Sequence, residues 1–348
     1  MARPRGLIAG LAAGLFTPAL ANAQEFSHGL SYMTAFGPKN YSVVTLLYAV
    51  IIISLAVVAI IGGLVLVGAL MKRERPPDDR LAEVPLHRSA SGMPFIYIGL
   101  IPSFLILLGT LIWNYVVLAD VAQPHAKPAA TVSVVGHQWW WEVRYQNDDP
   151  SRAFTTANEI HVPVGQPVRV ELGTDDVIHS FWVPALTGKM DTIPGQNNVT
   201  WMQADRPGIY RGQCTEYCGQ QHAHMGLFVV ADLADDFKSW WNHQLEGPAV
   251  LNSEAEIAEA AAGQTVFMRR CAVCHTVLGT RAGGRVGPNL SHLMERRSIA
   301  AATLPNGIGY LSGWISDPQH IKPGNLMPNI PISPMELTQL RAFLQTLR

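Results

Sequence analysis

Cysteine is scarce in this chain, with four residues in 348, and none of the four stands apart from a motif. They occur as Cys214-Thr-Glu-Tyr-Cys218, followed by His222 and Met225, and as Cys271-Ala-Val-Cys274-His275. Neither pair is typical of a structural disulfide. Cys-x-x-Cys-His is the signature of covalent c-type haem attachment, and clustered soft ligands are the kind that copper selects. Two redox centres on one chain indicate electron transfer.

Charged side chains are also few, at 15% of the sequence against 48% hydrophobic residues. Residues 41–71 and 89–119 contain none, and each stretch exceeds the ~20 residues that a helix needs to cross a bilayer. Residues 24–120 therefore predict a transmembrane hairpin, with spans at about 41–71 and 93–119 that contact membrane lipid. The linker at 72–92 is rich in Lys and Arg, so the positive-inside rule places it in the cytoplasm and both ends on the exported face.

Residues 1–23 predict a secretory signal peptide. Arg3 and Arg5 precede an apolar run, and Ala21-Asn22-Ala23 provides a cleavage site. The alternative is a first membrane anchor, although the apolar run is shorter than a span requires. We expect a multi-pass protein of a bacterial-type plasma membrane, with its following domains on the periplasmic or outer face and no nucleic-acid partner.

The region after the second span predicts a small all-β domain. Residues 131–145 and 168–172 alternate or run like strands between Pro, Gly and Asp turn signals. Residues 199–202 and 227–231 are further strand candidates. This pattern is typical of a sandwich or barrel.

A second exported domain, predicted over residues 253–348, has helical character. Ser253-Glu-Ala-Glu256 resembles a capping box at the start of an Ala-rich helix. A terminal helix begins near Ser333-Pro334 and carries an apolar stripe of Leu337, Leu340, Leu344 and Leu347. Gly247-Pro248 lies in the short connector between the two domains.

The first cysteine motif places two thiolates, an imidazole and a thioether within twelve residues, and His179 is a second imidazole upstream. A mononuclear blue copper site needs only one Cys, whereas this set, with a carbonyl, can hold two copper ions bridged by both sulfurs. A Cys-x3-Cys disulfide would leave His222 and Met225 unexplained. Zinc would have no use for Met225.

Segments around this cluster closely resemble subunit II of haem–copper cytochrome c oxidases. The matching segments are Gly136-His-Gln-Trp-Trp-Trp141, Asp176-Val-Ile-His179-Ser-Phe-Trp-Val-Pro184, Asp191-Thr-Ile-Pro-Gly195, Arg206-Pro-Gly208 and Gly212-Gln-Cys214. The resemblance covers roughly residues 1–245 and implies a cupredoxin domain at 121–245. The expected fold is therefore multidomain: a two-helix transmembrane hairpin, an all-β cupredoxin-like domain and an all-α domain.

Position by position, this resemblance implies a dinuclear CuA centre. Its side-chain ligands would be His179, Cys214, Cys218, His222 and Met225. Glu216 would ligate through its backbone carbonyl, and its carboxylate would reach a magnesium ion shared with subunit I. Trp139 matches the aromatic residue through which an electron arrives from cytochrome c. The alternative for the tryptophan run is ordinary core or interface packing.

The second cysteine motif implies one covalent haem c. Cys271 and Cys274 would form thioethers, and His275 would bind the iron. The best candidate for the other axial ligand is Met327, in Lys322-Pro-Gly-Asn-Leu-Met-Pro328; Met294 and Met335 fall in expected helices. This loop is similar to the distal loop of class I cytochromes c, and Gly287-Pro-Asn-Leu290 also fits that family. The similarity covers residues 253–348.

A subunit II with a fused cytochrome domain looks like the caa3-type oxidases. The resemblance implies that a cytochrome, or a quinol–cytochrome c reductase complex, reduces haem c, which reduces CuA. CuA would then reduce haem a in subunit I, where oxygen becomes water; subunit III would be a further partner. One alternative is a membrane-anchored carrier of another complex, such as a CuA-type nitric oxide reductase. A quinol oxidase subunit II is disfavoured because such chains typically lose the copper ligands.

The sequence departs from this family in one respect. Many members carry a glutamate near the start of the second span, at the mouth of a proton pathway, but residues 93–102 contain no acidic side chain. His87 in the linker, or a residue of another subunit, is a candidate substitute.

Overall fold

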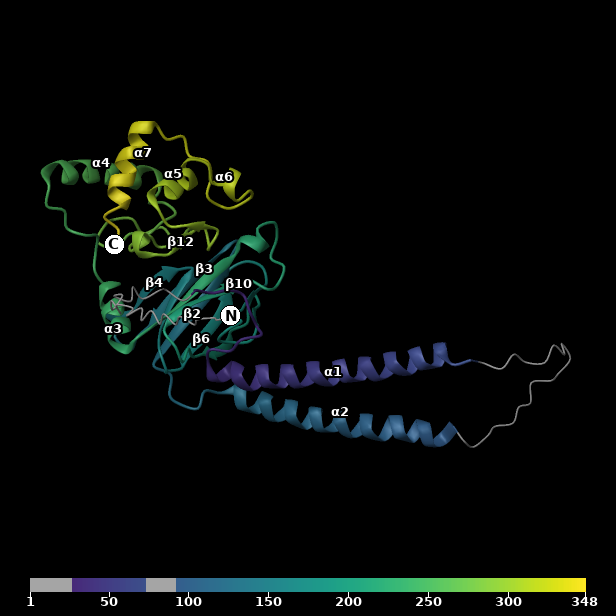
Figure 1. Ribbon diagram of the computed structural model, residues 1–348. Coiled ribbons are helices and arrows are strands. Elements are labelled where there is room, and N and C mark those ends of the chain that lie inside the picture. Colours follow the sequence, from purple (N-terminus) through teal and green to yellow (C-terminus); the bar gives the residue numbers. More distant parts are fainter. Residues whose placement is uncertain (1–26, 73–91) are drawn as a thin grey trace, which may run out of the picture.

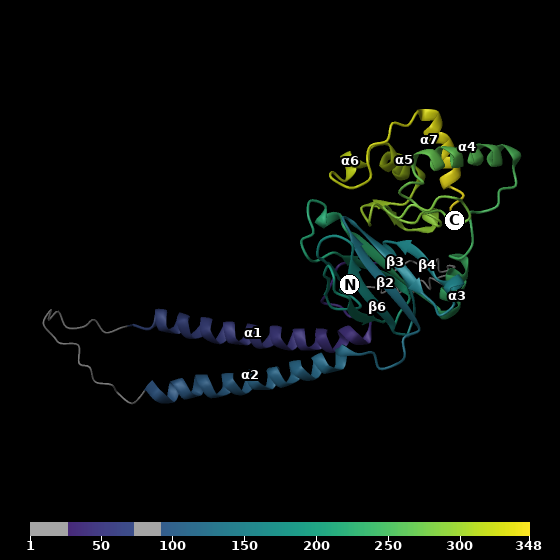
Figure 2. The ribbon, with the colours of Figure 1, turned by 180° about the vertical axis from the view of Figure 1, so that it is seen from behind.

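The computed structural model describes residues 27–72 and 92–348, which form two long helices, a β domain and a helical domain (Figures 1 and 2). The predicted multidomain fold class is confirmed. The predicted signal peptide at 1–23 lies outside the described residues, as does almost all of the linker at 72–92, including His87.

The two long helices, α1 (Pro38–Leu70) and α2 (Met93–Ala122), extend side by side from the β domain (Figures 1 and 2). Both are long and apolar enough to cross a membrane by length and composition. Ser42 of α1 donates a hydrogen bond to Asp120 of α2 at 3.0 Å, next to the β domain. The Trp201 indole donates to the carbonyl of Val121 at 2.9 Å, which ties the end of α2 to that domain.

The β domain contains a five-stranded sheet, in the order β4-β3-β2-β6-β9, and a four-stranded sheet, in the order β1-β10-β11-β5. The strands are β1 (Ser27–His28), β2 (Ala130–His137), β3 (Trp140–Gln146), β4 (Phe154–Ala157), β5 (Glu159–Pro163), β6 (Val168–Thr174), β9 (Asn198–Met202), β10 (Gly208–Gln213) and β11 (Gly226–Asp232). A separate ribbon pairs β7 (His179–Phe181) with β8 (Met190–Thr192). Helix α3 (Ala234–His243) follows β11.

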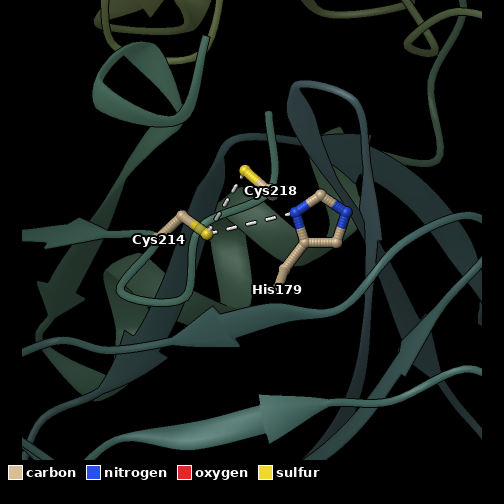
Figure 3. Close-up of side chains that lie close together, drawn as sticks. All are labelled: His179, Cys214 and Cys218. Atoms are coloured by element: carbon tan, nitrogen blue, oxygen red, sulfur yellow. Dashed lines mark hydrogen bonds between the residues drawn. The ribbon is translucent and has the colours of Figure 1, made fainter. Parts of the chain in front are cut away.

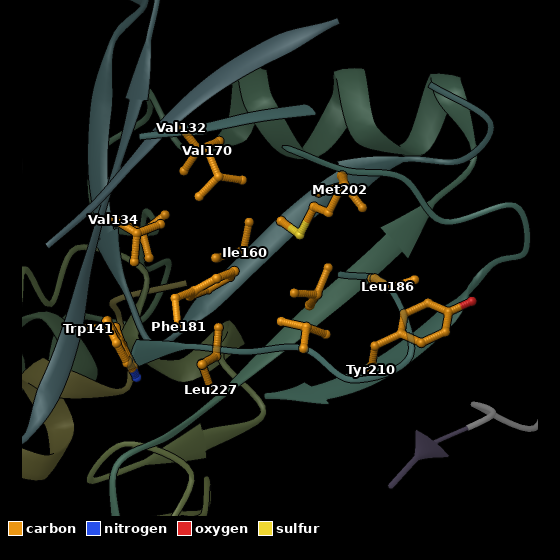
Figure 4. Packing of buried hydrophobic residues seen from close by; sticks show 14 of the residues in the cluster. Val132, Val134, Trp141, Ile160, Val170, Phe181, Leu186, Met202, Tyr210 and Leu227 are labelled. Atoms are coloured by element: carbon orange, nitrogen blue, oxygen red, sulfur yellow. The ribbon is translucent and has the colours of Figure 1, made fainter. Parts of the chain in front are cut away.

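The core of the β domain lies between these sheets (Figure 4). In β6 the side chains of Val168, Val170 and Leu172 are buried while the intervening Arg169 is exposed, which is the period of two that a sheet imposes. Side chains from the four-stranded sheet, such as Ile160 and Leu227, belong to the same cluster. This scaffold fixes the loops at the end of the sandwich that faces the helical domain.

The helical domain comprises α4 (Glu254–Arg270), α5 (Ile308–Ser316), α6 (Pro318–Ile321) and α7 (Pro334–Leu344), with a small hairpin of β12 (Ser298–Ile299) and β13 (Leu304–Pro305). Helices α4 and α7 pack so closely that a Cβ atom on Gly263 would lie 1.9 Å from the carbonyl oxygen of Gln339. Only glycine fits there. Three of the predicted stripe residues, Leu340, Leu344 and Leu347, are buried in the core.

The predicted capping box at Ser253 does not form. Ser253 occupies the N-cap of α4, but its side chain makes no capping hydrogen bond. This end of α4 is exposed, so water can satisfy its free N–H groups. A capping box is instead present at α7, between Ser333 and Glu336.

The helical domain rests on one end of the β sandwich (Figure 1). Ala301, in the β12–β13 turn, is buried against Trp140 and Ala157 of the β domain, and its carbonyl accepts a hydrogen bond from Gly226 N at 3.0 Å. Ala300, Ala301 and Ala302 all have φ between 53° and 59°. Non-glycine residues hold such a conformation only where their surroundings impose it. The packing and hydrogen bonding between the two domains therefore hold this turn in its unusual backbone conformation.

Candidate metal centre and haem site

The loops at this end of the β sandwich bring the predicted copper ligands together. His179 begins β7, and the other ligands lie between β10 and β11. The Cys214 sulfur lies 3.8 Å from the Cys218 sulfur and 4.0 Å from His179 Nδ1 (Figure 3). The Cys218 sulfur lies 3.6 Å from His222 Nδ1 and 3.9 Å from Met225 Sδ. The donor atoms of His179, His222 and Met225 thus lie close to the sulfurs of Cys214 and Cys218.

The backbone carbonyl of Glu216 also faces this cluster, 3.3 Å from the Cys214 sulfur. Glu216 is exposed, whereas Cys214 and Cys218 are buried. One residue therefore presents two oxygen donors in different surroundings, a carbonyl at the cluster and a carboxylate at the surface.

The donor set fits a dinuclear copper centre better than the alternatives. Both cysteines are free thiols, and their 3.8 Å separation is far from the ~2.05 Å of a disulfide. Met225 is fully buried with its thioether directed at Cys218, a contact that a zinc site would not use. Hydrogen bonding with Cys218, and secondarily with His179, lowers the pKa of the Cys214 thiol. Thiolate is the form that binds metal.

Asp176 orients the buried His179. Its Oδ1 lies 2.7 Å from His179 Nε2, and its Oδ2 accepts a hydrogen bond from Gln138 N at 2.6 Å. The carboxylate fixes the ring so that Nδ1 faces the sulfurs, which is the arrangement in which a second residue holds a metal-binding histidine.

The predicted haem ligands line a single cavity of about 420 Å³ between the helical domain and the β domain. Cys271, Cys274, His275 and Met327 all line it. Within the described part of the chain, Met327 is the one methionine in its wall; Met294 and Met335 are not among the lining residues. The cavity is predominantly apolar, as a haem requires.

The surroundings of His275 leave its Nε2 without the backbone contact that Nδ1 makes. Its Nδ1 donates a hydrogen bond to the carbonyl of Pro288 at 2.8 Å, and burial lowers the pKa of the imidazole, which favours the neutral form. A Cβ atom on Gly287 would lie 2.6 Å from the ring, so only glycine lets this loop pass so near. These features fit a proximal haem ligand.

Trp139 lies between the haem cavity and the sulfur cluster. It lines the cavity, is only 8% exposed, and its indole N–H donates to the carbonyl of Cys218 at 3.0 Å. Gln138 donates to the same carbonyl at 2.7 Å. The tryptophan therefore packs into the interface and also contacts the backbone of a candidate copper ligand.

Lys322 fastens the haem-side loop to this tryptophan. The side chain is 2% exposed, and its ammonium group donates to the carbonyls of Trp139 and His224 at 2.7 Å each and of Ala300 at 3.1 Å. Burial lowers the pKa of Lys322 to about 7. The next residue also contacts the β domain, because the carbonyl of Pro323 accepts from Gln221 at 2.7 Å.

Sequence reasoning missed both Asp176 and Lys322 as parts of these sites. Asp176 lies three residues before His179, a spacing that could have suggested a supporting carboxylate. Lys322 precedes Pro323-Gly324 in a polar loop and has the sequence character of a solvent-exposed side chain.

Two families of known proteins match separate parts of this chain. Residues 147–232 match the family described as cytochrome C oxidase subunit II, periplasmic domain, and residues 260–348 match cytochrome c. Cytochrome c oxidase subunit 2 of Alkalihalophilus pseudofirmus is 33% identical over 327 residues, covering 92% of each chain. The proteins of the same name from Bacillus sp. (strain PS3) and Bacillus subtilis are 34% and 32% identical, over 60% and 64% of each chain.

Proposed function

Because this chain belongs to the cytochrome c oxidase subunit II family and carries a cytochrome c domain, we propose that it is the electron-accepting subunit of a caa3-type oxidase. The bound groups would supply one-electron chemistry, from haem c to the dinuclear copper centre and on to haem a of subunit I, where oxygen is reduced to water. Oxygen chemistry would take place in subunit I.

The main observation behind this proposal is that one residue, Trp139, contacts both candidate sites. Trp139 faces the haem cavity and donates its indole hydrogen bond to Cys218 within the copper ligand set. Lys322 holds the backbone of Trp139 to the loop that carries Met327. The proposed electron path runs from the haem cavity through Trp139 and its hydrogen bond to the Cys218 carbonyl, and so reaches the copper ligands.

Each candidate residue has a defined task in this proposal. The haem would be attached through Cys271 and Cys274 and ligated by His275 and Met327. The copper ions would be held by His179, Cys214, Cys218, His222, Met225 and the carbonyl of Glu216. The exposed Glu216 carboxylate would bind magnesium together with subunit I. Trp139 would conduct electrons between the two redox centres.

The apolar helices would anchor the chain in the plasma membrane against subunit I, with both folded domains on the exported face. Subunit III and a cytochrome or quinol–cytochrome c reductase complex would be the remaining partners.

Purification in mild detergent tests this assembly. We expect a large polypeptide bearing haem a or haem o to copurify, with haem c and CuA absorption in one spectrum. Recovery of this chain alone as an active carrier would contradict the proposal, and nitric oxide reduction without oxygen reduction would favour a nitric oxide reductase.

Replacement of Met327 by Ala should lower the midpoint potential of the haem. Loss of a thioether ligand removes the preference for ferrous iron, and axial ligands set haem potentials over a range of ~0.8 V, so we expect a drop on the order of 100 mV. Redox titration and the low-spin optical spectrum measure the change. Met335→Ala is the matched control because Met335 is exposed and outside the cavity wall. An unaltered spectrum in Met327→Ala would assign the distal ligand to another residue.

A further inference from the structure

A second group of ligand-type side chains lies at the boundary between the β domain and the helical domain, away from Trp139. His243 ends α3 of the β domain, whereas His292 and Glu295 belong to the helical domain. One donor atom from each of the three lies within 4.8 Å of the others. In Figure 1, α3 lies at the edge of the boundary near the C-terminus, and α6 lies toward the opposite edge.

The buried His292 has an unusual environment. It is 3% exposed, yet neither ring nitrogen has a partner with good hydrogen-bond geometry in the described structure, although the backbone of Arg348 interacts with the ring. Buried polar groups nearly always have a partner, so two nitrogens without good geometry on one ring require an explanation. Nδ1 of His292 lies 3.9 Å from Glu295 Oε2, and the ring packs against His243 with a centroid separation of 5.0 Å. The His292 ring therefore lies next to the other two ligand-type side chains.

We propose that His243, His292 and Glu295 form a binding site for a divalent transition metal ion, best matched by Zn²⁺, shared between the two domains. Two imidazoles and one carboxylate, with water in the fourth position, are an established zinc ligand set. A cavity of about 60 Å³ adjoins His292 and Glu295 and offers space for that water.

The surroundings of His243 support this assignment. Its Nε2 lies 3.0 Å from Glu295 Oε1, and its Nδ1 lies 3.0 Å from Glu246 Oε2. A carboxylate on Nδ1 favours the tautomer in which Nε2 carries the lone pair, and a metal ion would replace the direct contact between Nε2 and Glu295. The side chains of His243 and Glu295 are each 36% exposed, which gives an ion a route in from solvent and leaves both side chains room to adjust.

The local charges are compatible with a bound cation. Arg296 is the nearby positive charge; its guanidinium donates to the carbonyl of Asn289 and is balanced in part by the Glu159 carboxylate. The carboxylates of Glu246 and of the proposed ligand Glu295 each contact a ring nitrogen of His243 and add negative charge at the site.

Because the ligands come from both domains, the complete site exists only when the domains are docked. A ligand that binds one state alone stabilises that state. Zinc binding would therefore hold the helical domain against the β domain at a position away from Trp139 and Lys322.

Zinc titration of the full-length chain in detergent, with haem and copper already bound, tests this site. Isothermal titration calorimetry should show one Zn²⁺ ion per chain, and Glu295→Gln should weaken this binding by at least about 10-fold. His292→Ala should have a similar effect. Glu295→Gln is the decisive variant because Glu295 is partly exposed and its amide replacement preserves size. His125→Ala, which alters an exposed histidine outside the cluster, is the matched control and should bind zinc as the unaltered chain does.

X-ray absorption at the zinc edge should show nitrogen and oxygen ligands with scattering from two imidazoles. Absence of zinc binding in the unaltered chain would overturn the proposal and leave His243 and Glu295 as an ion pair between domains. Equal affinity in the unaltered chain and Glu295→Gln would also overturn it. Neither readout depends on oxidase activity.

Discussion

Cys218→Ser is expected to abolish the near-infrared absorption of the copper centre and to slow cytochrome oxidation by more than about 100-fold. The Cys218 sulfur is the hub of the cluster, with Cys214, His222 and Met225 all within 3.9 Å of it. A serine hydroxyl is a hard ligand that cannot bridge two copper ions as a thiolate does. Even replacing residues that only support a metal ligand costs roughly 10–100-fold in affinity or activity, so loss of a bridging ligand should cost more.

Near-infrared spectroscopy, copper analysis and steady-state oxidation of a reduced donor measure this effect. Tyr217→Phe is the matched control, because Tyr217 lies beside Cys218 in the same loop but its side chain is 75% exposed. The haem c spectrum should be retained in both variants, since the haem ligands come from the other domain. If Cys218→Ser kept its copper absorption and its turnover, the copper assignment would be wrong.

Trp139→Leu is expected to slow electron transfer from the haem to the copper centre by about 10- to 100-fold while leaving both optical spectra in place. The substitution removes the aromatic ring between the cavity and Cys218, together with the indole hydrogen bond to the Cys218 carbonyl. A displacement of about 1 Å at a reacting site can cost ~100-fold, which sets the scale of the expected loss. Rapid-mixing or flash experiments that follow haem c reoxidation measure the rate.

Trp139→Phe separates the two contributions, because phenylalanine keeps an aromatic ring but lacks the N–H donor. A rate near that of the unaltered chain in Trp139→Phe would assign the effect to the ring, and a rate near that of Trp139→Leu would assign it to the hydrogen bond. An unchanged rate in Trp139→Leu would mean that electrons follow another route. Trp139 would then serve only in packing.

The sequence predicted the fold class because hydrophobic patterning and scarce, chemically distinctive residues carry that information locally. Charge-free stretches predicted the two long helices, and the alternation in residues 168–172 predicted a strand of the sandwich. The sequence predicts one strand-like stretch over residues 131–145, but the chain forms β2 and β3 as an antiparallel pair, with Gln138 and Trp139 at the turn. Both β2 and β3 are rich in buried apolar residues, so the hydrophobic pattern does not change where the chain turns back on itself.

The contacts between domains could not be predicted from the sequence. Lys322 is buried because three carbonyls from separate segments converge on its ammonium group, and two of them belong to the other domain. The same holds for His292, which lacks any local pattern that would mark it as buried. Such positions depend on tertiary docking, whereas the Cys-x-x-Cys-His and Cys-x3-Cys motifs are complete within a few residues.

The burial of Trp139 has a consequence for the choice of redox partner. A tethered domain competes at an effective concentration near the millimolar range, so a freely diffusing cytochrome at micromolar levels would be excluded from the surface that the helical domain covers. Partner selection would then move to the rim of the haem cavity, where Val273 and Val286 are exposed at 79% and 58%. Under the proposed function, substitutions at that rim would change which donor is accepted without disturbing the copper ligands.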